Sequence, residues 1–76
     1  MIDEIRQAIL AHLPEAEVTV NSNDGVHFSA TVKSNKLTGL SRVQQHQEVY
    51  TALTKEFGQD WSQVIHALEI KIVKGD

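Results

Sequence analysis

Residues 17–34 read EVTVNSNDGVHFSATVKS, and this stretch decides the fold. Apolar and polar residues alternate on both sides of the central NSNDG, which is the pattern of strands with one buried face. Asn, Asp and Gly tolerate the positive φ angles that tight turns need, so NSNDG predicts a turn between the strands. We therefore expect an antiparallel hairpin whose apolar side chains are Val18, Val20, Val26, Phe28, Ala30 and Val32.

A helix is expected before this hairpin. Ile2, Ile5, Ile9 and Leu13 recur at helical spacing. Pro14 predicts the end of the helix, because the residue before a proline is disfavoured in helical conformation.

A longer helix is expected after the hairpin. Ser41 and Gln44 have the spacing of a capping box, which marks a helix start, and Gly58 is a typical helix stop. The apolar stripe that we expect between them is Val43, His46, Tyr50, Leu53 and Phe57. A short helix should begin at Asp60, with Trp61, Val64, Ile65 and Leu68 on one side.

The chain then alternates again as a strand, with Leu68, Ile70 and Ile72 on one side and Glu69 and Lys71 on the other. The expected order is α-β-β-α-α-β, an α+β domain with a three-stranded mixed sheet covered by helices. If the last strand lies beside the second strand of the hairpin, the right-handed crossover rule makes the two parallel.

Two histidines lie where these parallel strands should begin. His27 opens the second strand and His66 precedes the third, and neighbouring strands are about 5 Å apart, so both imidazoles would reach one metal ion at this edge. Strict alternation, however, puts His66 on the face of Leu68 and His27 on the opposite face. Convergence therefore requires the strand ends to depart from alternation.

The other two histidines favour structural roles. His12 lies beside the apolar stripe of the first helix and is expected to be a half-exposed surface side chain. His46 falls on the expected stripe of the long helix, which favours a partly buried histidine whose polar atoms are satisfied.

Composition narrows the functional classes. The chain has 76 residues, which suits a single domain over 1–76, and a net charge of −3 that disfavours nonspecific binding to nucleic acid. It contains no cysteine, so any thiolate ligand must come from a partner. No apolar run approaches a membrane span, and the opening residues lack the pattern of a signal peptide, so we expect a cytoplasmic protein.

Three ordered segments resemble the BolA-like protein family. They are LTGLS followed by RVQQHQEVY (residues 37–50), DGVHF in the hairpin, and IHALEIK near the end of the chain. The resemblance implies a fold similar to class II KH domains. The hairpin segment is similar to the branch of the family with histidine rather than cysteine in that loop.

The resemblance also implies a function. BolA-like proteins pair with monothiol glutaredoxins, and the pair holds a two-iron, two-sulfur cluster with thiolates from the glutaredoxin and from glutathione. Carried onto this sequence, the remaining metal ligands are His66 and His27. The protein would then be a non-enzymatic partner in iron–sulfur trafficking or sensing. The cluster is expected only in the complex, and the free chain is expected to be a monomer or a weak dimer.

A nucleic-acid-binding transcriptional regulator with a KH-like surface is the alternative. Lys33, Lys36 and Arg42 favour it. Against it stand the acidic charge, glutamines where the family has basic residues beside His46, the absence of a GxxG clamp, and no expected exposed aromatic pair.

An enzyme is the least favoured class. No catalytic triad pattern, phosphate-binding loop or H-E-x-x-H motif is present. Asp24 lies near His27, but a small domain offers little concavity for a general-base pair.

Overall fold

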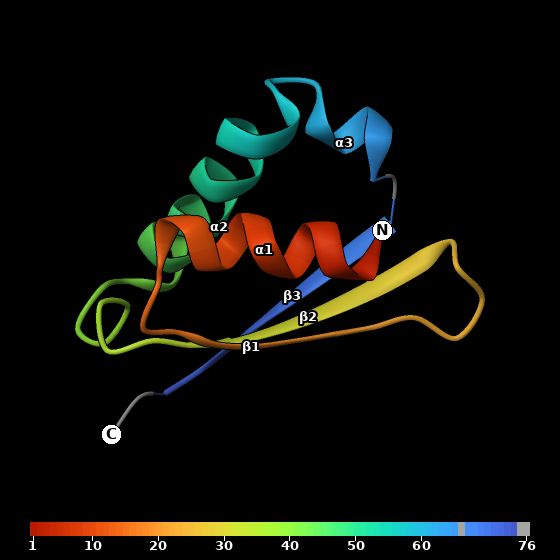
Figure 1. Ribbon diagram of the computed structural model, residues 1–76. Coiled ribbons are helices and arrows are strands. Elements are labelled where there is room, and N and C mark those ends of the chain that lie inside the picture. Colours follow the sequence, from red (N-terminus) through yellow and green to blue (C-terminus); the bar gives the residue numbers. More distant parts are fainter. Residues whose placement is uncertain (66, 75–76) are drawn as a thin grey trace.

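The computed structural model describes residues 1–65 and 67–74 (Figure 1). The elements follow the predicted order: α1 (Ile2–His12), β1 (Glu17–Asn21), β2 (His27–Lys33), α2 (Arg42–Phe57), α3 (Trp61–Val64) and β3 (Ala67–Val73). The predicted α+β class with a three-stranded mixed sheet is confirmed.

The sheet has the strand order β1-β2-β3. β1 pairs antiparallel with β2, and β2 pairs parallel with β3, as the crossover rule predicts. All three helices lie on one side of the sheet (Figure 1). One face of the sheet is therefore packed and the other is left to solvent, which explains the alternation of apolar and polar residues in the strands.

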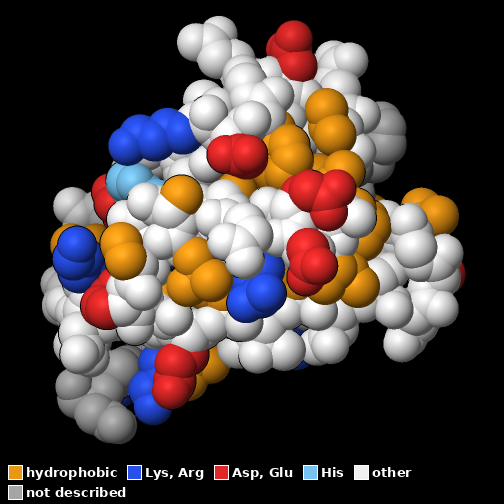
Figure 2. Space-filling model, viewed as in Figure 1, with side chains coloured by type: hydrophobic (Ala, Val, Ile, Leu, Met, Phe, Trp, Pro, Cys, Tyr) orange, Lys and Arg blue, Asp and Glu red, His pale blue; other side chains and the backbone are white. Residues whose placement is uncertain are grey.

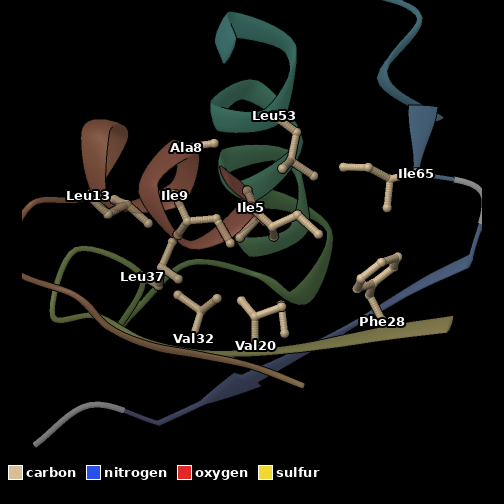
Figure 3. Close-up of a cluster of buried hydrophobic side chains, with 12 residues drawn as sticks. Ile5, Ala8, Ile9, Leu13, Val20, Phe28, Val32, Leu37, Leu53 and Ile65 are labelled. Atoms are coloured by element: carbon tan, nitrogen blue, oxygen red, sulfur yellow. The ribbon is translucent and has the colours of Figure 1, made fainter. Parts of the chain in front are cut away.

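The core lies between this face of the sheet and the helices, where side chains from α1, the hairpin and α2 point toward one another (Figure 3). α1 contributes Ile5, Ala8 and Ile9, which are at most 1% exposed. The other buried apolar residues are Leu13, Val20, Phe28, Ala30, Val32, Leu37, Val49, Ala52, Leu53 and Ile65.

α2 begins with the predicted capping box. The Ser41 hydroxyl accepts the backbone N–H of Gln44, and the Gln44 side chain accepts the backbone N–H of Ser41. The predicted stripe is only partly correct. Leu53 is buried and His46 and Phe57 are partly buried, but Val43 is 66% exposed and Tyr50 is 41% exposed. The buried residues of this helix are Val49, Ala52 and Leu53. The apolar residues fit more than one stripe, and packing against α1 selects between them.

Three other residues of the predicted apolar stripes are exposed. Ile2, at the start of α1, is 38% exposed. Val26 is 59% exposed because it precedes β2 and belongs to the hairpin turn, where its backbone N–H binds the carboxylate of Asp24. Val64, at the end of the short α3, is 52% exposed, while the adjacent Ile65 is buried. None of the helices within 1–65 and 67–74 is long and apolar enough to span a bilayer.

Candidate metal site

The turn before His27 is held by hydrogen bonds from polar side chains. The carboxylate oxygen Oδ1 of Asp24 accepts the backbone N–H of Val26 at 2.9 Å and that of His27 at 2.8 Å. The Ser22 hydroxyl accepts the backbone N–H of Gly25 at 2.8 Å, and Gly25 has a φ of 75°, which glycine adopts without strain. This segment therefore presents the first residue of β2 in a defined position.

The imidazole of His27 is bound to the same carboxylate. Its Nδ1 lies 2.7 Å from Oδ2 of Asp24. The backbone N–H of His27, the ring and the backbone N–H of Val26 all hold the pKa of Asp24 well below its ordinary value of 3.8. An ionised carboxylate only accepts hydrogen bonds, so Nδ1 must donate its proton to Oδ2. In the neutral ring, Nε2 then carries the lone pair.

Nε2 of His27 is accessible. The side chain is 74% exposed, and no residue within 1–65 or 67–74 makes a hydrogen bond to Nε2. A histidine that donates one ring N–H to a carboxylate and offers the other nitrogen is the usual arrangement of a metal ligand with its supporting group. His27 therefore fits a metal on the chemistry of its donor atom.

The surroundings of His27 are polar and shallow. A surface hollow of about 280 Å³ is lined by Asn21, Ser22, Asn23, Asp24, His27, Phe28, Ser29 and Glu69. Across the sheet, His27 pairs with Ala67 at the start of β3. His66 lies outside the described residues, so its convergence with His27 remains a prediction. In the described part of the chain, no group of three or more His, Cys, Asp or Glu residues is placed to hold a metal ion.

His12 and His46 have structural partners. Nε2 of His12 lies 3.0 Å from Oε1 of Glu48, and its Nδ1 lies 3.4 Å from Nζ of Lys55, so the ring links α1 to α2. Its side chain is only 19% exposed, less than the half exposure that we predicted, because α2 covers it. Nδ1 of His46 donates to the backbone carbonyl of Arg42 at 2.9 Å, which confirms a satisfied, partly buried histidine.

Two of the three basic residues of the alternative function lie close to carboxylates. Nζ of Lys33 is 3.9 Å from Glu17, and the charge of Lys36 contributes to holding the pKa of Glu15 below its ordinary value. Arg42 is the first residue of α2. Blue and red side chains are interspersed on the molecular face shown in Figure 2. A phosphate approaching Lys33 or Lys36 would therefore meet negative charge as well.

An aromatic pair joins α2 and α3, but only one of its rings is exposed, because Trp61 is partly buried against the core. The rings of Tyr50 and Trp61 stack with centroids 5.5 Å apart, and Tyr50 is 41% exposed. Two helices separated by a short turn bring these rings together, which residue spacing does not reveal. Since each ring covers a face of the other, the pair offers less aromatic surface to a nucleic-acid base.

The sequence predicted His27 as a candidate ligand, but it did not predict that the carboxylate of Asp24 holds the His27 ring. Asp24 was considered only as half of a general-base pair. The signal that was available is a turn aspartate three residues before a histidine, a spacing that lets one carboxylate bind both backbone N–H groups and the ring.

Taken together, the fold and the site define a small α+β domain with helices on one face of a mixed sheet and an accessible imidazole at the start of its central strand. The sequence model of the BolA-like proteins matches residues 5–75. The chain therefore belongs to the BolA-like protein family, and the predicted resemblance is confirmed.

Several solved structures are similar to this chain. A BolA homologue from Coxiella burnetii is 32% identical, with a TM-score of 0.73 over 99% of this chain and 90% of that one. The XC975 protein is 39% identical, with a TM-score of 0.58 over 96% and 86% of the two chains. Yeast Fra2 is 26% identical, with a TM-score of 0.65 over 97% and 78%. No curated protein sequence matches this chain.

Proposed function

We propose that this protein is a non-enzymatic partner of a monothiol glutaredoxin and that it contributes His27 and His66 to a two-iron, two-sulfur cluster shared by the two proteins. Membership of the BolA-like family supports the class of function. The observation that carries the proposal is the imidazole of His27, whose Nδ1 is held by Asp24 while Nε2 is open to solvent.

The side chains that could bind a metal in this chain are consistent with a cluster shared between two proteins. With no cysteine of its own, the chain offers neutral imidazoles, and the sulfur ligands must come from the glutaredoxin and from glutathione. When bound, such a cluster supplies electron transfer or release of iron and sulfide, and imidazole ligation raises its reduction potential relative to an all-thiolate site. The chain itself supplies two nitrogen ligands and holds the ring of His27 in one orientation.

The register of the sheet supports a site shared by the two proposed ligands. His27 pairs with Ala67, the residue that follows His66 in the sequence. The adjacent hollow is polar and open, so a partner protein has access to Nε2. Both features suit a site completed at an interface.

The test is anaerobic reconstitution of this chain with a monothiol glutaredoxin, glutathione, iron and sulfide, followed by visible absorption and circular dichroism, and by electron paramagnetic resonance after one-electron reduction with dithionite. We expect a cluster with nitrogen hyperfine coupling in the mixture and no stable cluster on this chain alone.

Three variants sharpen this test. His27→Ala and His66→Ala should each shorten the lifetime of the cluster and reduce the nitrogen coupling. His46→Ala is the matched control, because it removes an imidazole that bonds to a backbone carbonyl in α2. A mixture in which both ligand variants match the unmodified protein would refute the assignment of these residues.

A further inference from the structure

β3 is an edge strand, and its inner side chains are incompletely buried. Within residues 1–65 and 67–74, no strand pairs with the edge of β3 that faces away from β2. The inward-facing residues of β2 are at most 8% exposed, whereas their register partners on β3 are only partly buried. Those β3 residues are Leu68, Ile70 and Ile72. Exposed edges of this kind readily accept another strand.

Space for another strand is present beside β3. A groove of about 600 Å³ lies between the first turns of α2 and the strand, lined by Arg42, Gln45 and His46 on the helix and by residues 70–73 on the strand. α2 packs chiefly on α1 and makes few contacts with β3. The helix therefore leaves the edge open to an approaching chain.

The sequence of β3 is complementary to itself. Residues 67–73 read ALEIKIV. When two copies run antiparallel with Ile70 opposite Ile70, Glu69 lies opposite Lys71 of the second copy and Lys71 lies opposite Glu69. Opposite residues share one face of a sheet, so both ion pairs fall on the solvent face. On the packed face, Leu68 then lies opposite Ile72.

Glu69 and Lys71 also lie close to each other within one copy. Nζ of Lys71 lies 3.6 Å from Oε1 of Glu69 in the same strand. Antiparallel pairing would therefore produce four charges in which every neighbour has the opposite sign. Another antiparallel register would be less favourable, because it would move Glu69 away from Lys71 of the second copy. A shift by one residue would instead place apolar side chains on the solvent face.

We propose that two copies of this chain associate through their β3 edges, antiparallel about a two-fold axis at Ile70, and so join their sheets into one continuous sheet. The same surface is used by both copies, as a two-fold interface requires. This inference goes beyond the proposed function and does not depend on it.

The test is a charge exchange measured by sedimentation equilibrium from low micromolar to millimolar protein. Glu69→Lys and Lys71→Glu each place like charges opposite one another at both pairs, so each variant should dimerise roughly tenfold or more weakly than the unmodified chain. An equimolar mixture of the two variants should restore dimerisation as a heterodimer, because opposite charges then meet again. Glu56→Lys is the control, since it makes the same charge change at an exposed position on α2.

Amide hydrogen exchange locates the interface in the same samples. Protection in β3 should rise with protein concentration in the unmodified chain, and circular dichroism verifies that each variant is folded. A dimer that is insensitive to both variants overturns the proposal. A chain that stays monomeric at every protein concentration also overturns the proposal. The β3 edge would then be a candidate site for an extended segment of a different protein.

Discussion

Asp24 holds the ring of His27 and the backbone of the same residue at once. Its Oδ2 lies 2.7 Å from Nδ1 of the ring, and its Oδ1 accepts the backbone N–H of His27 at 2.8 Å. One carboxylate thus fixes the turn and the tautomer together. The sequence resemblance points to His27 as a candidate ligand, and this contact shows that Nε2 is the ring nitrogen left available.

The first prediction concerns this contact. In Asp24→Asn, the amide can turn its NH₂ group toward the ring, which favours Nδ1 as an acceptor and moves the proton to Nε2. We expect long-range ¹H–¹⁵N NMR of the metal-free chain to show this change of tautomer, and the reconstituted cluster to be more labile. Asp60→Asn is the control, because Asp60 makes no side-chain capping bond. An unchanged tautomer in Asp24→Asn would contradict the role assigned to Asp24.

The second prediction tests which face of α2 is buried. Val49 is 0% exposed and Val43 is 66% exposed in the same helix. Val49→Ala should lower the free energy of unfolding by about 2 kcal/mol, because it removes buried methyl groups and leaves a cavity. Val43→Ala should change it by less than about 0.5 kcal/mol. Urea denaturation measures both, and an effect at Val43 as large as that at Val49 would contradict the assigned buried face.

The third prediction concerns Glu15, whose carboxylate accepts a hydrogen bond from the hydroxyl of the buried Ser34. This bond, followed by one from the backbone N–H of Lys36, lowers the pKa of Glu15 from 4.5. Because the folded-state pKa is depressed, the stabilisation is present above pH 4.5 and is lost as the pH falls through the lowered value. Glu15→Gln should therefore lower the melting temperature at pH 6. It should change the melting temperature little at a pH below the lowered pKa, where Glu15 itself is protonated.

Ser34→Ala separates this contact from other effects of the substitution. Ser34→Ala removes the hydroxyl donor, so it should reduce the pH dependence of the melting temperature when Glu15 is present. In the Glu15→Gln background it should change the melting temperature less. Thermal unfolding followed by circular dichroism between pH 3 and 7 measures all four proteins. Additive effects would show that the two residues do not act together.

The fourth prediction concerns nucleic acid. Lys33 lies beside Glu17 and Lys36 beside Glu15, so we expect weak, nonspecific binding to duplex DNA at physiological salt. Replacing both carboxylates in Glu15→Gln/Glu17→Gln should raise the affinity, because phosphates would no longer compete with them. Fluorescence anisotropy over a range of salt concentrations measures this. A sequence-selective nanomolar complex of the unmodified chain would favour the alternative function.

Much of the fold could be predicted because its signals are local or periodic. The alternation in the hairpin predicts β1 and β2, and the spacing of Ser41 and Gln44 predicts the start of α2. The parallel direction of β2 and β3 was predicted on the condition that the two strands are neighbours, and the structure confirms that they are. His27 could be predicted to be exposed because it alternates with apolar residues in a strand that has one buried face.

Other features depend on elements that are distant in sequence. The buried face of α2 was predicted only in part, because its apolar residues fit several stripes. Leu53 was predicted to be buried, but only the position of α1 adds Val49 and Ala52. The stacking of Tyr50 on Trp61 likewise depends on how α3 folds back along α2.

The sequence by itself therefore determined the order of elements, the antiparallel pairing of the hairpin and the identity of the candidate ligands, because these follow from residue types and their spacing. Only the tertiary structure decided which nitrogen of His27 is available and which edge of the sheet remains open. Both depend on where atoms lie in space: Oδ2 of Asp24 close to Nδ1, and α2 packed against α1 rather than over β3.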